Sequence, residues 1–440
     1  MGAILDTFRS RTPGSADRHR RATAVMPGGD TRTTTYHPPY PLTMASGSGP
    51  YLADVDGNRY VDLIGNYTSL VHGNAYPPIV EAAARQIPCG TAWPARNDAQ
   101  LELAELLTER VASVEQVRLC NSGTEATMLC AYIARAVTGR RTVLMARYGY
   151  HGSLEEFEFG FAGHEGPDTL LARHGDVAAF EDVLERHGSE IACVVLEPVM
   201  GSAGLSVAPA GALARIAESA RAAGALFVLD EVITLRLATG GAQALHGVVP
   251  DLTAMGKIIG GGFPVGAVGG RADLLSVTVP PGPRLVHSGT FNGNPVTAAA
   301  GVVSVRELTD ERIAAMARRT EWLERALLAA AAEAGVPFST RRAGSLLQCF
   351  LSAEPPEVNQ LRTDGEAATA FHLAALNAGL FFAGRGFMAL STVLDDALLE
   401  EVAGRAADAL RAVAVELGHG EGSSGRARTG VARDGAPTPV

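Results

Sequence analysis

Short β-branched segments alternate with alanine-rich segments through the centre of the sequence, and this alternation constrains the fold more than any other feature. The β-prone segments are VRLCN at 117–121, TVLMA at 142–146, CVVLEP at 193–198 and LFVLDE at 226–231. Glycine, proline or polar residues bound each of them. Because strand and helix patterns that alternate in this way form parallel sheets covered by helices, we expect an α/β fold with a mostly parallel central sheet.

A second, smaller α+β unit is expected after about residue 300, where the sequence changes to long helical patterns and short strands. A single core stops growing at roughly 250 to 300 residues, and the chain has 440. The last stretch is rich in Gly, Ser, Pro and Arg and is expected to be disordered. The predicted organisation is an N-terminal arm with part of the small domain at 1–55, a large domain at 56–300, a small α+β domain at 301–418 and a disordered tail at 419–440.

Local patterns predict individual elements. Asp56-Gly57 stands between β-prone residues, as a tight hairpin turn requires. Asn97 precedes an amphipathic pattern that is typical of a helix with an Asn cap. The residues expected on the buried face of this helix are Leu101, Leu106, Leu107 and Val111. The arm is not expected to contain a long helix at 26–42, because that segment is rich in Pro and Gly.

Composition and targeting signals argue against several classes of partner. Lys and Arg number 37 against 47 Asp and Glu, and no basic stripe occurs, so nucleic acid is not an expected partner. The five cysteines are scattered without a C-x-x-C pair and are interpreted as reduced core residues, so no metal site is expected. The chain starts without a signal-peptide core, and no apolar run reaches the roughly 18 residues of a membrane span. A cytoplasmic protein without a membrane partner is therefore expected.

Residues at the carboxyl ends of the predicted strands are the candidate ligand contacts, since ligands bind beyond these ends in parallel sheets. Ser122, Gly123 and Thr124 open a helix, where free N–H groups and the helix dipole favour a phosphate. An ordinary Ser or Thr helix cap is the alternative. Tyr150 follows the second strand on a loop bracketed by glycines, where an aromatic ring can lie over a flat heterocycle. His151 beside it is interpreted as a structural residue without a chemical role.

Asp230 and Lys257 complete the set of candidates. Asp230 closes an apolar strand, where a carboxylate needs a cation such as a protonated pyridine nitrogen; pairing with arginine or capping a turn is the alternative. Lys257 stands alone among apolar and glycine residues, and burial there would make its amine a nucleophile able to form an imine. The glycines around it fit neither G-x-G-x-x-G nor a Walker A loop. Phosphate cup, aromatic ring, carboxylate and amine together indicate a pyridoxal 5'-phosphate site.

These residues resemble the class III, fold-type I pyridoxal phosphate aminotransferases, in the branch that holds glutamate-1-semialdehyde aminomutase and the β-phenylalanine (β-amino acid) aminotransferases. The specific stretches are NSGTEAT at 121–127, GYHG at 149–152, LEPVMG at 196–201, LDEV at 229–232, PDLTAMGKIIGGGFPVGAVGGR at 250–271 and HSGTFNGNP at 287–295. The resemblance implies a mostly parallel seven-stranded sheet with helices on both faces, a smaller α+β domain, and a transaminase that uses pyridoxal 5'-phosphate.

Site roles follow from the resemblance, position by position. The cofactor residues that it implies are Ser122, Gly123 and Thr124 for the phosphate, Tyr150 and Val232 for the two ring faces, Asp230 for the pyridinium nitrogen and Lys257 for the Schiff base. Glu197 stands in a Glu-Pro pair near the cofactor in this family and would help to position the site. Thr290 resembles the residue that family dimers donate to the phosphate of the neighbouring subunit, which implies a homodimer.

Substrate recognition is also implied by the resemblance. Arg32 in the arm and Arg385 in Arg385-Gly386-Phe387 resemble carboxylate-binding residues of the β-amino acid aminotransferases. A guanidinium suits this role because it grips a carboxylate through two parallel hydrogen bonds. A surface or structural arginine is the alternative for each. Tyr67 lies in a segment where the family varies its substrate pockets, so aromatic and aliphatic side chains of the substrate both stay open.

The expected reaction moves an amino group from a β-amino acid, or a similar amino acid, to a 2-oxo acid such as 2-oxoglutarate or pyruvate. Lys257 would take the proton from the carbon that bears the nitrogen. The alternative enzyme is a glutamate-1-semialdehyde-type 2,1-aminomutase, which moves nitrogen within one molecule and needs no second keto acid. A pyridoxal-binding regulator without catalysis is a third interpretation, for which the sequence contains no DNA-binding extension.

Overall fold

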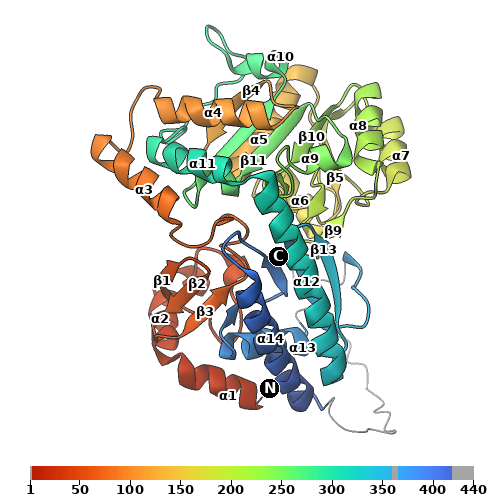
Figure 1. The fold of residues 1–440 in the computed structure, drawn as a ribbon. Helices are drawn as coiled ribbons and strands as arrows, with labels where there is room; N and C mark the ends of the chain where they lie inside the picture. Colours follow the sequence, from red (N-terminus) through yellow and green to blue (C-terminus); the bar gives the residue numbers. More distant parts are fainter. Residues whose placement is uncertain (1, 359–364, 419–440) are drawn as a thin grey trace.

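The computed structural model describes residues 2–358 and 365–418. Figure 1 shows two units, a larger one built around a central sheet and a smaller one that contains both the N-terminal helices and the C-terminal helix. The tail expected at 419–440 lies outside the described residues. Within the described ranges, no helix is long and apolar enough to cross a membrane, and no group of three or more His, Cys, Asp or Glu residues could hold a metal ion.

A seven-stranded sheet forms the centre of the larger unit. In spatial order its strands are β4 (Gln116–Cys120), β12 (Gly266–Gly270), β11 (Leu252–Gly256), β10 (Leu226–Asp230), β7 (Ile191–Leu196), β5 (Thr142–Ala146) and β6 (Thr169–Ala172). Strand β12 is antiparallel to both of its neighbours, and the other adjacent pairs are parallel. The mostly parallel sheet predicted from the alternation is therefore confirmed.

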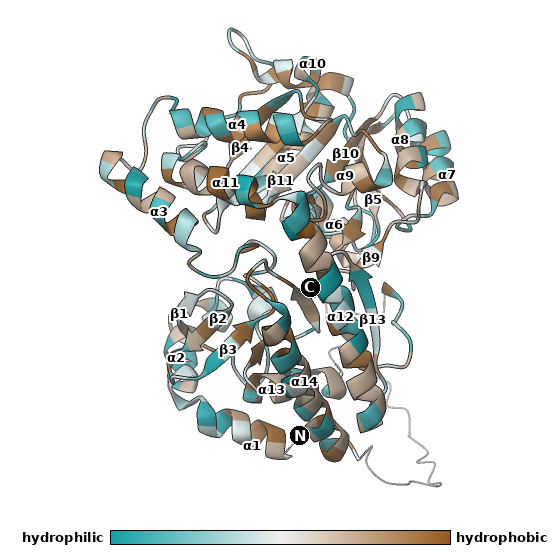
Figure 2. Cartoon of the chain, viewed as in Figure 1, coloured by the Kyte–Doolittle hydropathy of each residue, from teal (hydrophilic) through white to brown (hydrophobic). Residues whose placement is uncertain are grey.

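Helices cover both faces of this sheet because side chains alternate along each strand. On β5, Val143 and Met145 pack in the core beneath α5 (Gly123–Thr138). Leu144 packs on the opposite face, with residues of α7 (Val177–His187) and α8 (Ala212–Ala222). Figure 2 shows apolar residues along the central strands and hydrophilic residues on the outer helices α7 and α8. Burial on both faces explains why the strands are continuous apolar runs.

The remaining elements of the larger unit surround the sheet. Its further helices are α3 (Pro77–Gln86), α4 (Asp98–Arg110), α6 (Glu155–Ala162), α9 (Ala242–His246), α10 (Ala272–Leu275) and α11 (Pro295–Glu307), and β8 (Val199–Met200) pairs with β9 (Ser206–Val207). Its 3₁₀ turns are η3 (Ile87–Cys89), η4 (Thr234–Arg236), η5 (Lys257–Gly260) and η6 (Ser276–Thr278). Four of the five cysteines are buried as expected, whereas Cys89 is exposed at the end of η3.

Helix α4 begins where the sequence predicts, but its buried face differs in one residue. The Asn97 side chain accepts a hydrogen bond from the Gln100 N–H at 2.8 Å, which confirms the cap. Leu101 was expected in the core and is instead 58% exposed, while Leu103 and Leu107 are fully buried. Leu103 and Leu107 share one stripe of the helix, and Leu101 lies roughly 160° around the axis from Leu103 at 3.6 residues per turn.

The smaller unit combines the two ends of the described chain. Its sheets are β1 (Met44–Ser48), β2 (Tyr51–Asp54), β3 (Arg59–Asp62) and β15 (Leu380–Phe381) in one, and β13 (Ser339–Ala343), β14 (Leu346–Phe350) and β16 (Phe387–Ala389) in the other. Its helices are α1 (Gly2–Arg11), α2 (Pro13–Thr23), α12 (Asp310–Ala334), α13 (Glu366–Asn377) and α14 (Asp396–Glu416), with 3₁₀ turns η1 (Pro27–Gly29) and η2 (Thr33–Thr35). The hairpin predicted at Asp56-Gly57 joins β2 and β3, which pair antiparallel.

One hydrophobic core holds this unit together. Ile4 and Phe8 of α1 pack in the same cluster as Tyr60 of β3 and Leu410 of α14. Helices α1 and α2 were not expected; the segment at 26–42 that was expected to lack a long helix contains only two 3₁₀ turns. Residues far apart in sequence therefore depend on each other for burial, and Figure 1 shows α1 beside α13 and α14.

Arg236 links the two units from a fully buried position in η4. Its Nε donates to Ser345 Oγ at 3.0 Å, its Nη1 donates to the Thr68 carbonyl at 3.4 Å, and its Nη2 donates to the Leu390 carbonyl. All three acceptors are uncharged. Burial lowers the pKa of Arg236 to about 10, so the guanidinium keeps its charge at neutral pH. The contact therefore combines a buried charge with three neutral acceptors from other parts of the chain.

We expect Arg236→Ala to lower the free energy of unfolding by about 3 kcal/mol or more, because it leaves buried acceptors unpaired and opens a cavity. Arg236→Lys should restore little, since one ammonium cannot reach three separated acceptors. The thermal unfolding midpoint measures both changes. Arg215→Ala, which removes an exposed ion pair with Glu181, is the control and should leave the midpoint nearly unchanged. An Arg236→Ala protein as stable as the Arg215→Ala protein would contradict this role.

Candidate active site

A cavity of about 380 Å³ opens at the carboxyl edge of the central sheet. The predicted site residues that line it are Ser122, Gly123, Thr124, Tyr150, Glu197, Asp230, Val232 and Lys257. They come from the ends of β4, β5, β7, β10 and β11 and the segments that follow these strands. The strand-end reasoning therefore brings together eight residues that are spread over 135 positions of the sequence, from 122 to 257.

Lys257 follows β11 as the first residue of η5 and is the only lysine in the sequence. Its backbone is left-handed, with φ of 49°, a conformation that is strained for a residue with a side chain and is found most often at functional sites. Burial lowers the pKa of the amine, while Asp230 and Glu197 act in the opposite direction. A larger share of neutral amine favours nucleophilic attack and proton transfer.

Asp230 ends β10 and is held by two hydrogen bonds. One carboxylate oxygen accepts the Val232 N–H at 3.0 Å, and the other lies 2.8 Å from His151 Nδ1. His151 is fully buried; burial lowers its pKa, but the bond to Asp230 and the charge of Asp230 outweigh burial and raise the pKa overall. Its Nε2 is buried without a hydrogen-bond partner. His151, to which sequence reasoning gave no chemical role, therefore fixes the carboxylate at the end of the cavity.

Glu197 is buried on the wall of the same cavity and fixes a loop. Its carboxylate accepts the Tyr150 N–H at 2.9 Å and the Gly201 N–H at 3.3 Å. Burial raises the pKa of Glu197 to about 7, against the opposing effect of His151. The loop that carries Tyr150 is thus anchored to β7 through a carboxyl group that titrates near neutral pH.

The N-terminus of α5 also lines the cavity. Ser122 is the helix cap, since its Oγ accepts the Glu125 N–H at 3.1 Å. It also lines the cavity, so capping the helix does not exclude contact with a ligand. The first N–H groups of a helix lack partners inside the helix and attract anions. A Cβ on Gly123 would lie 3.0 Å from Val232, and a Cβ on Gly152 would collide with Thr124. Glycine is therefore required where this end of the cavity is narrowest.

The cavity fits a flat phosphorylated heterocycle on these observations. The α5 N-terminus, which can bind an anion, and the carboxylate of Asp230 both line it. Val232 and Tyr150 stand on the cavity walls, and the amine of Lys257 faces the same space. The ring of His151 backs the Asp230 carboxylate through Nδ1, at 2.8 Å.

Arg32, Tyr67 and Arg385 meet beside this cavity and do not line it. The guanidinium carbons of Arg32 and Arg385 each lie 5.9 Å from the centre of the Tyr67 ring. Arg385 donates to the Gly201 carbonyl at 3.2 Å and keeps a buried Nε without a partner, whereas Arg32 is exposed and donates to Asn66 Oδ1 at 3.0 Å. Two cations from distant parts of the sequence thus share one aromatic ring.

A left-handed turn carries Tyr67. Gly65, Asn66, Tyr67 and Thr68 have φ of 52°, 46°, 52° and 78° in succession. Each residue with a side chain costs roughly 1 to 2 kcal/mol in this conformation, so such runs need strong local support. The Thr68 N–H donates to the Ile64 carbonyl and the Leu70 N–H to the Gly65 carbonyl, each at 2.9 Å. Sequence reasoning did not predict this turn, because an Asn-Tyr-Thr run carries no left-handed signal beyond Gly65 and Asn66.

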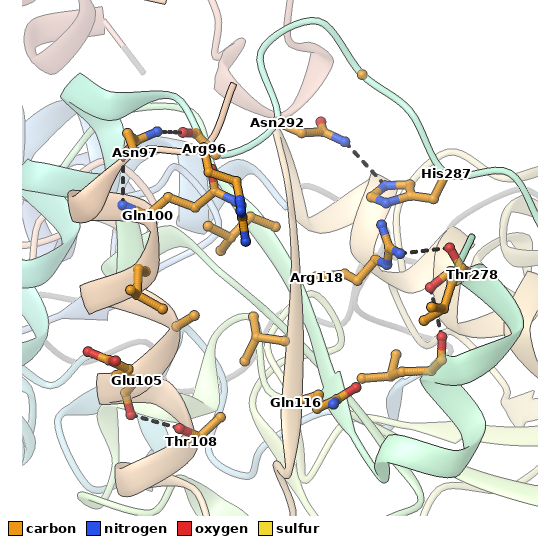
Figure 3. Close-up of a pocket in the computed structure, with 18 of the residues that line it drawn as sticks. Arg96, Asn97, Gln100, Glu105, Thr108, Gln116, Arg118, Thr278, His287 and Asn292 are labelled. Carbon is orange, nitrogen blue, oxygen red and sulfur yellow. Dashed lines mark hydrogen bonds between the residues drawn. The ribbon is translucent and has the colours of Figure 1, made fainter. Parts of the chain in front are cut away.

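Thr290 lies away from the cavity of its own chain. It is exposed on the segment between η6 and α11. Neighbouring residues of this segment border a groove of about 630 Å³ against α4, shown in Figure 3. Asn292 accepts a hydrogen bond from Asn121 Nδ2 at 2.8 Å and lies 3.3 Å from His287 Nε2. The segment that carries Thr290 is therefore tied to the base of the α5 N-terminus.

Comparison with known proteins places these features in a family. The class-III aminotransferase family matches residues 33–157 and 168–410. The β-phenylalanine transaminase of Variovorax paradoxus is 37% identical over 90% of this chain and 93% of its own length. The glutamate-1-semialdehyde 2,1-aminomutase of Thermomicrobium roseum is 38% identical over 95% and 99%. The crystal structure of an ω-transaminase from Sphaerobacter thermophilus, 39% identical, matches with a TM-score of 0.87 over 92% of this chain and 99% of that one.

The raised pKa of Glu197 predicts a pH-dependent stability. The group loses its proton near pH 4.5 when unfolded and near pH 7 when folded, so the folded cofactor-free protein loses stability as pH rises through this window. Glu197→Gln cannot titrate, and its unfolding free energy relative to the parent should rise by about 2 kcal/mol between pH 5 and pH 8. Thermal unfolding of both proteins at the two pH values measures this difference. Glu185→Gln, at an exposed position, is the control, and its unfolding free energy relative to the parent should not change with pH. The same lack of change for Glu197→Gln would refute the raised pKa of Glu197.

Proposed function

This chain belongs to the class-III aminotransferases, enzymes that use pyridoxal 5'-phosphate, and we propose that it transfers the amino group of a β-amino acid to a 2-oxo acid such as 2-oxoglutarate or pyruvate. The observation that carries the choice of substrate is the pair of guanidinium groups on Tyr67, beside the cavity of the chain's only lysine. Both substrates of this reaction carry a carboxylate.

The cavity residues divide the contacts to the cofactor among them. Ser122, Gly123 and Thr124 at the α5 N-terminus hold the phosphate, and Asp230 holds the pyridine nitrogen in its protonated form. Val232 and Tyr150 contact the two faces of the ring. When bound, pyridoxal 5'-phosphate supplies an electron-withdrawing ring that labilises the C–H bond of the carbon bearing the substrate nitrogen.

Lys257 would hold the cofactor covalently through Nζ until the amine of the substrate takes its place and releases the lysine as a free amine. The freed Nζ would then accept the proton from the substrate carbon that bears the nitrogen and give up the same proton later in the half-reaction. Burial supports this role because it increases the share of neutral amine at neutral pH. The strained backbone of Lys257 aims the side chain into the cavity from the end of β11.

Asp230, His151 and Glu197 orient the groups that react. The His151 bond leaves the Asp230 carboxylate in one orientation, and the Glu197 carboxylate holds the Tyr150 loop through two N–H groups. We expect Glu197 to act on the position of Tyr150 and not on a proton of the substrate.

Arg32 and Arg385 are proposed to bind the substrate carboxylates. The carboxylate of a β-amino acid stands one carbon further from the reacting carbon than that of a 2-oxo acid, and two cations at different positions suit the two distances. Arg385 has a buried Nε without a partner, which a carboxylate oxygen would satisfy. Arg32 is exposed and its contact with Asn66 is a single hydrogen bond. Tyr67 holds both side chains beside the site.

An intramolecular aminomutase is the second candidate, because curated relatives of that name match the chain at 38% identity over nearly its full length. Such an enzyme uses the same cavity and the same lysine. Its cycle needs no second keto acid, and this requirement separates the two activities in a single experiment.

The test is to add 3-amino-3-phenylpropanoate to the holoenzyme without an acceptor and to follow the absorbance of the bound cofactor. We expect one equivalent of keto product, followed by turnover only after 2-oxoglutarate or pyruvate is supplied. Lys257→Ala should lose turnover by at least about 10⁴-fold. Borohydride reduction should label a single side chain, since the sequence contains one lysine. Conversion of an amino-aldehyde without any acceptor, and no response to the β-amino acid, would favour the aminomutase.

A homodimer that shares its sites is proposed as the active unit. Thr290 is exposed and does not line the cavity of its own chain, and it stands on a segment bound to Asn121 through Asn292. Large apolar side chains on the same segment and on α4 are exposed as well, and these are Leu101, Val279, Val286 and Phe291. An exposed apolar patch of this kind is typical of a surface that a partner covers. We propose that the Thr290 hydroxyl binds the phosphate in the neighbouring subunit.

Complementation between two variants tests the shared site. Thr290→Ala should weaken cofactor binding by about 10-fold, the effect of one hydrogen bond to a charged group. In a mixed dimer of Thr290→Ala with Lys257→Ala, the site that keeps Lys257 receives the intact Thr290 of its neighbour. Equilibrium dialysis of that mixed dimer should therefore recover the parental affinity at this site. If the mixed dimer still binds the cofactor weakly, Thr290 acts in the site of its own chain. Ser288→Ala, on the same segment, is the control and should keep the parental affinity.

A further inference from the structure

A second cavity of about 200 Å³ lies in the smaller unit, next to the cavity of Lys257. Asn66 lines both cavities and forms the wall between them. The second cavity is enclosed by β2, β3 and α13 and covered by the arm, whose Arg32 stands at its margin. The chamber, which Arg32 also lines, therefore adjoins the cavity of Lys257 at Asn66.

His372 is the unusual group of this chamber. It sits in the middle of α13, is 3% exposed, and has neither ring nitrogen in a hydrogen bond. Leaving a buried donor and acceptor without partners costs on the order of 1 to 3 kcal/mol each, so native proteins rarely keep such a group without a reason. Among the described residues that line the chamber, His372 alone has buried side-chain nitrogens or oxygens in this condition.

Asp62 and Tyr67, two other polar groups of the chamber, are bound within the protein. Asp62 accepts the Ile64 and Gly65 N–H groups at 3.0 and 2.9 Å and Asn74 Nδ2 at 2.9 Å. The Tyr67 hydroxyl donates to the Thr34 carbonyl at 2.7 Å. Among the described residues that line the chamber, the imidazole of His372 is therefore the side chain whose buried nitrogens the protein leaves without partners.

The charge state of His372 restricts what it can bind. Burial lowers its pKa well below the ordinary value, and the neighbouring His37, whose ring centre lies 4.7 Å away, acts in the same direction. Burial also lowers the pKa of His37 to about 4. Both rings are neutral at pH 7, so the two histidines offer neutral donors and acceptors, and the positive charge among the lining residues is that of Arg32. A neutral polar group such as a hydroxyl matches this chemistry.

The volume of the chamber and its apolar lining favour a ligand whose main part is an apolar ring. Leu52, Ile64, Leu70, Phe381 and Phe382 form the apolar walls. An apolar cavity of about 150 Å³ holds one benzene ring, so the volume here suits one ring with a small substituent. The strained turn at 65–68 gives the chamber its wall toward Lys257, and strain of this kind concentrates where a ligand must be positioned.

We propose that this chamber receives the side chain of the amino donor, that this side chain is a single ring bearing a neutral hydrogen-bonding group such as a phenol hydroxyl, and that His372 binds that group. This proposal rests on the proposed function for the rest of the amino donor, namely its amine and the carboxylate that Arg32 binds beside the chamber. The chamber then distinguishes a hydroxyphenyl from a phenyl side chain by one buried hydrogen bond. No residue of the chamber takes part in a bond-making step.

The test uses two ligands that lack the amine and cannot react, 3-(4-hydroxyphenyl)propanoate and 3-phenylpropanoate. Calorimetric titration of the holoenzyme should show the hydroxylated ligand to bind about 5-fold to 10-fold more tightly, the effect of one neutral hydrogen bond in a buried site. In His372→Leu the two ligands should bind with equal affinity. His372→Gln keeps an amide donor and acceptor and should retain part of the preference. The absorbance band of the bound cofactor and the unfolding midpoint verify that each variant is folded.

Gly384→Ala provides a steric version of the test that leaves His372 in place. A Cβ at this position would lie 3.9 Å from His372 Nε2 and 3.8 Å from the Cβ of His37, which is ordinary van der Waals contact. The added methyl group should fit the fold and reduce the preference for the hydroxylated ligand to about 2-fold or less. His246→Leu, which changes a histidine that lines neither cavity, should keep the parental preference.

Three outcomes would refute the proposed role of the chamber. They are equal affinity of the two ligands for the parent enzyme, a preference that survives His372→Leu, and no measurable binding of the hydroxylated ligand. Turnover of 3-amino-3-phenylpropanoate with an acceptor, measured on the same preparations, decides the proposed function separately. A preference for the hydroxylated ligand in an enzyme that does not turn over β-amino acids would support the chamber and refute that choice of donor.

Discussion

The burial of one amine and two carboxylates at the same edge of the sheet is the constraint on which the site depends. Strands β7, β10 and β11 are parallel neighbours, so Glu197, Asp230 and Lys257 emerge side by side where these strands end. Charges removed from water are tolerated only when they are paired or hydrogen-bonded. His151 binds Asp230 and two N–H groups bind Glu197, while burial shifts the Lys257 amine toward its neutral form. The surrounding elements supply these partners.

The parts of the fold and the site that could be predicted from the sequence are those set by local order along the chain. A residue that closes an apolar strand must lie at the sheet edge, which is why sequence reasoning expected Asp230 and Ser122 there, and both line the cavity at that edge. The shared core of α1 and α14 could not be predicted in this way, because it depends on packing between opposite ends of the chain. The partner of His151 lies 79 residues away and carried no local signal.

The smaller unit contributes to the site through its position relative to the sheet, and buried polar contacts help to fix that position. Arg236 reaches from η4 to Ser345 and Leu390 of the smaller unit and to Thr68 beside the left-handed turn. The same side chain that joins the units therefore also supports the segment that carries Tyr67. Movement of the smaller unit would shift Arg385, which donates to the Gly201 carbonyl of the larger unit, together with the carboxylate contacts proposed for it.

The left-handed turn at 65–68 explains how two cavities can share a wall one residue thick. Four successive residues in the left-handed region form this turn, and they place Asn66 where it lines both cavities and Tyr67 where it lines the smaller one. The strain is offset by Asp62, which binds the N–H groups of Ile64 and Gly65 at the start of the turn. Arg32 then binds Asn66 from the arm, so that the position of a cation and the wall between the cavities depend on the same side chain.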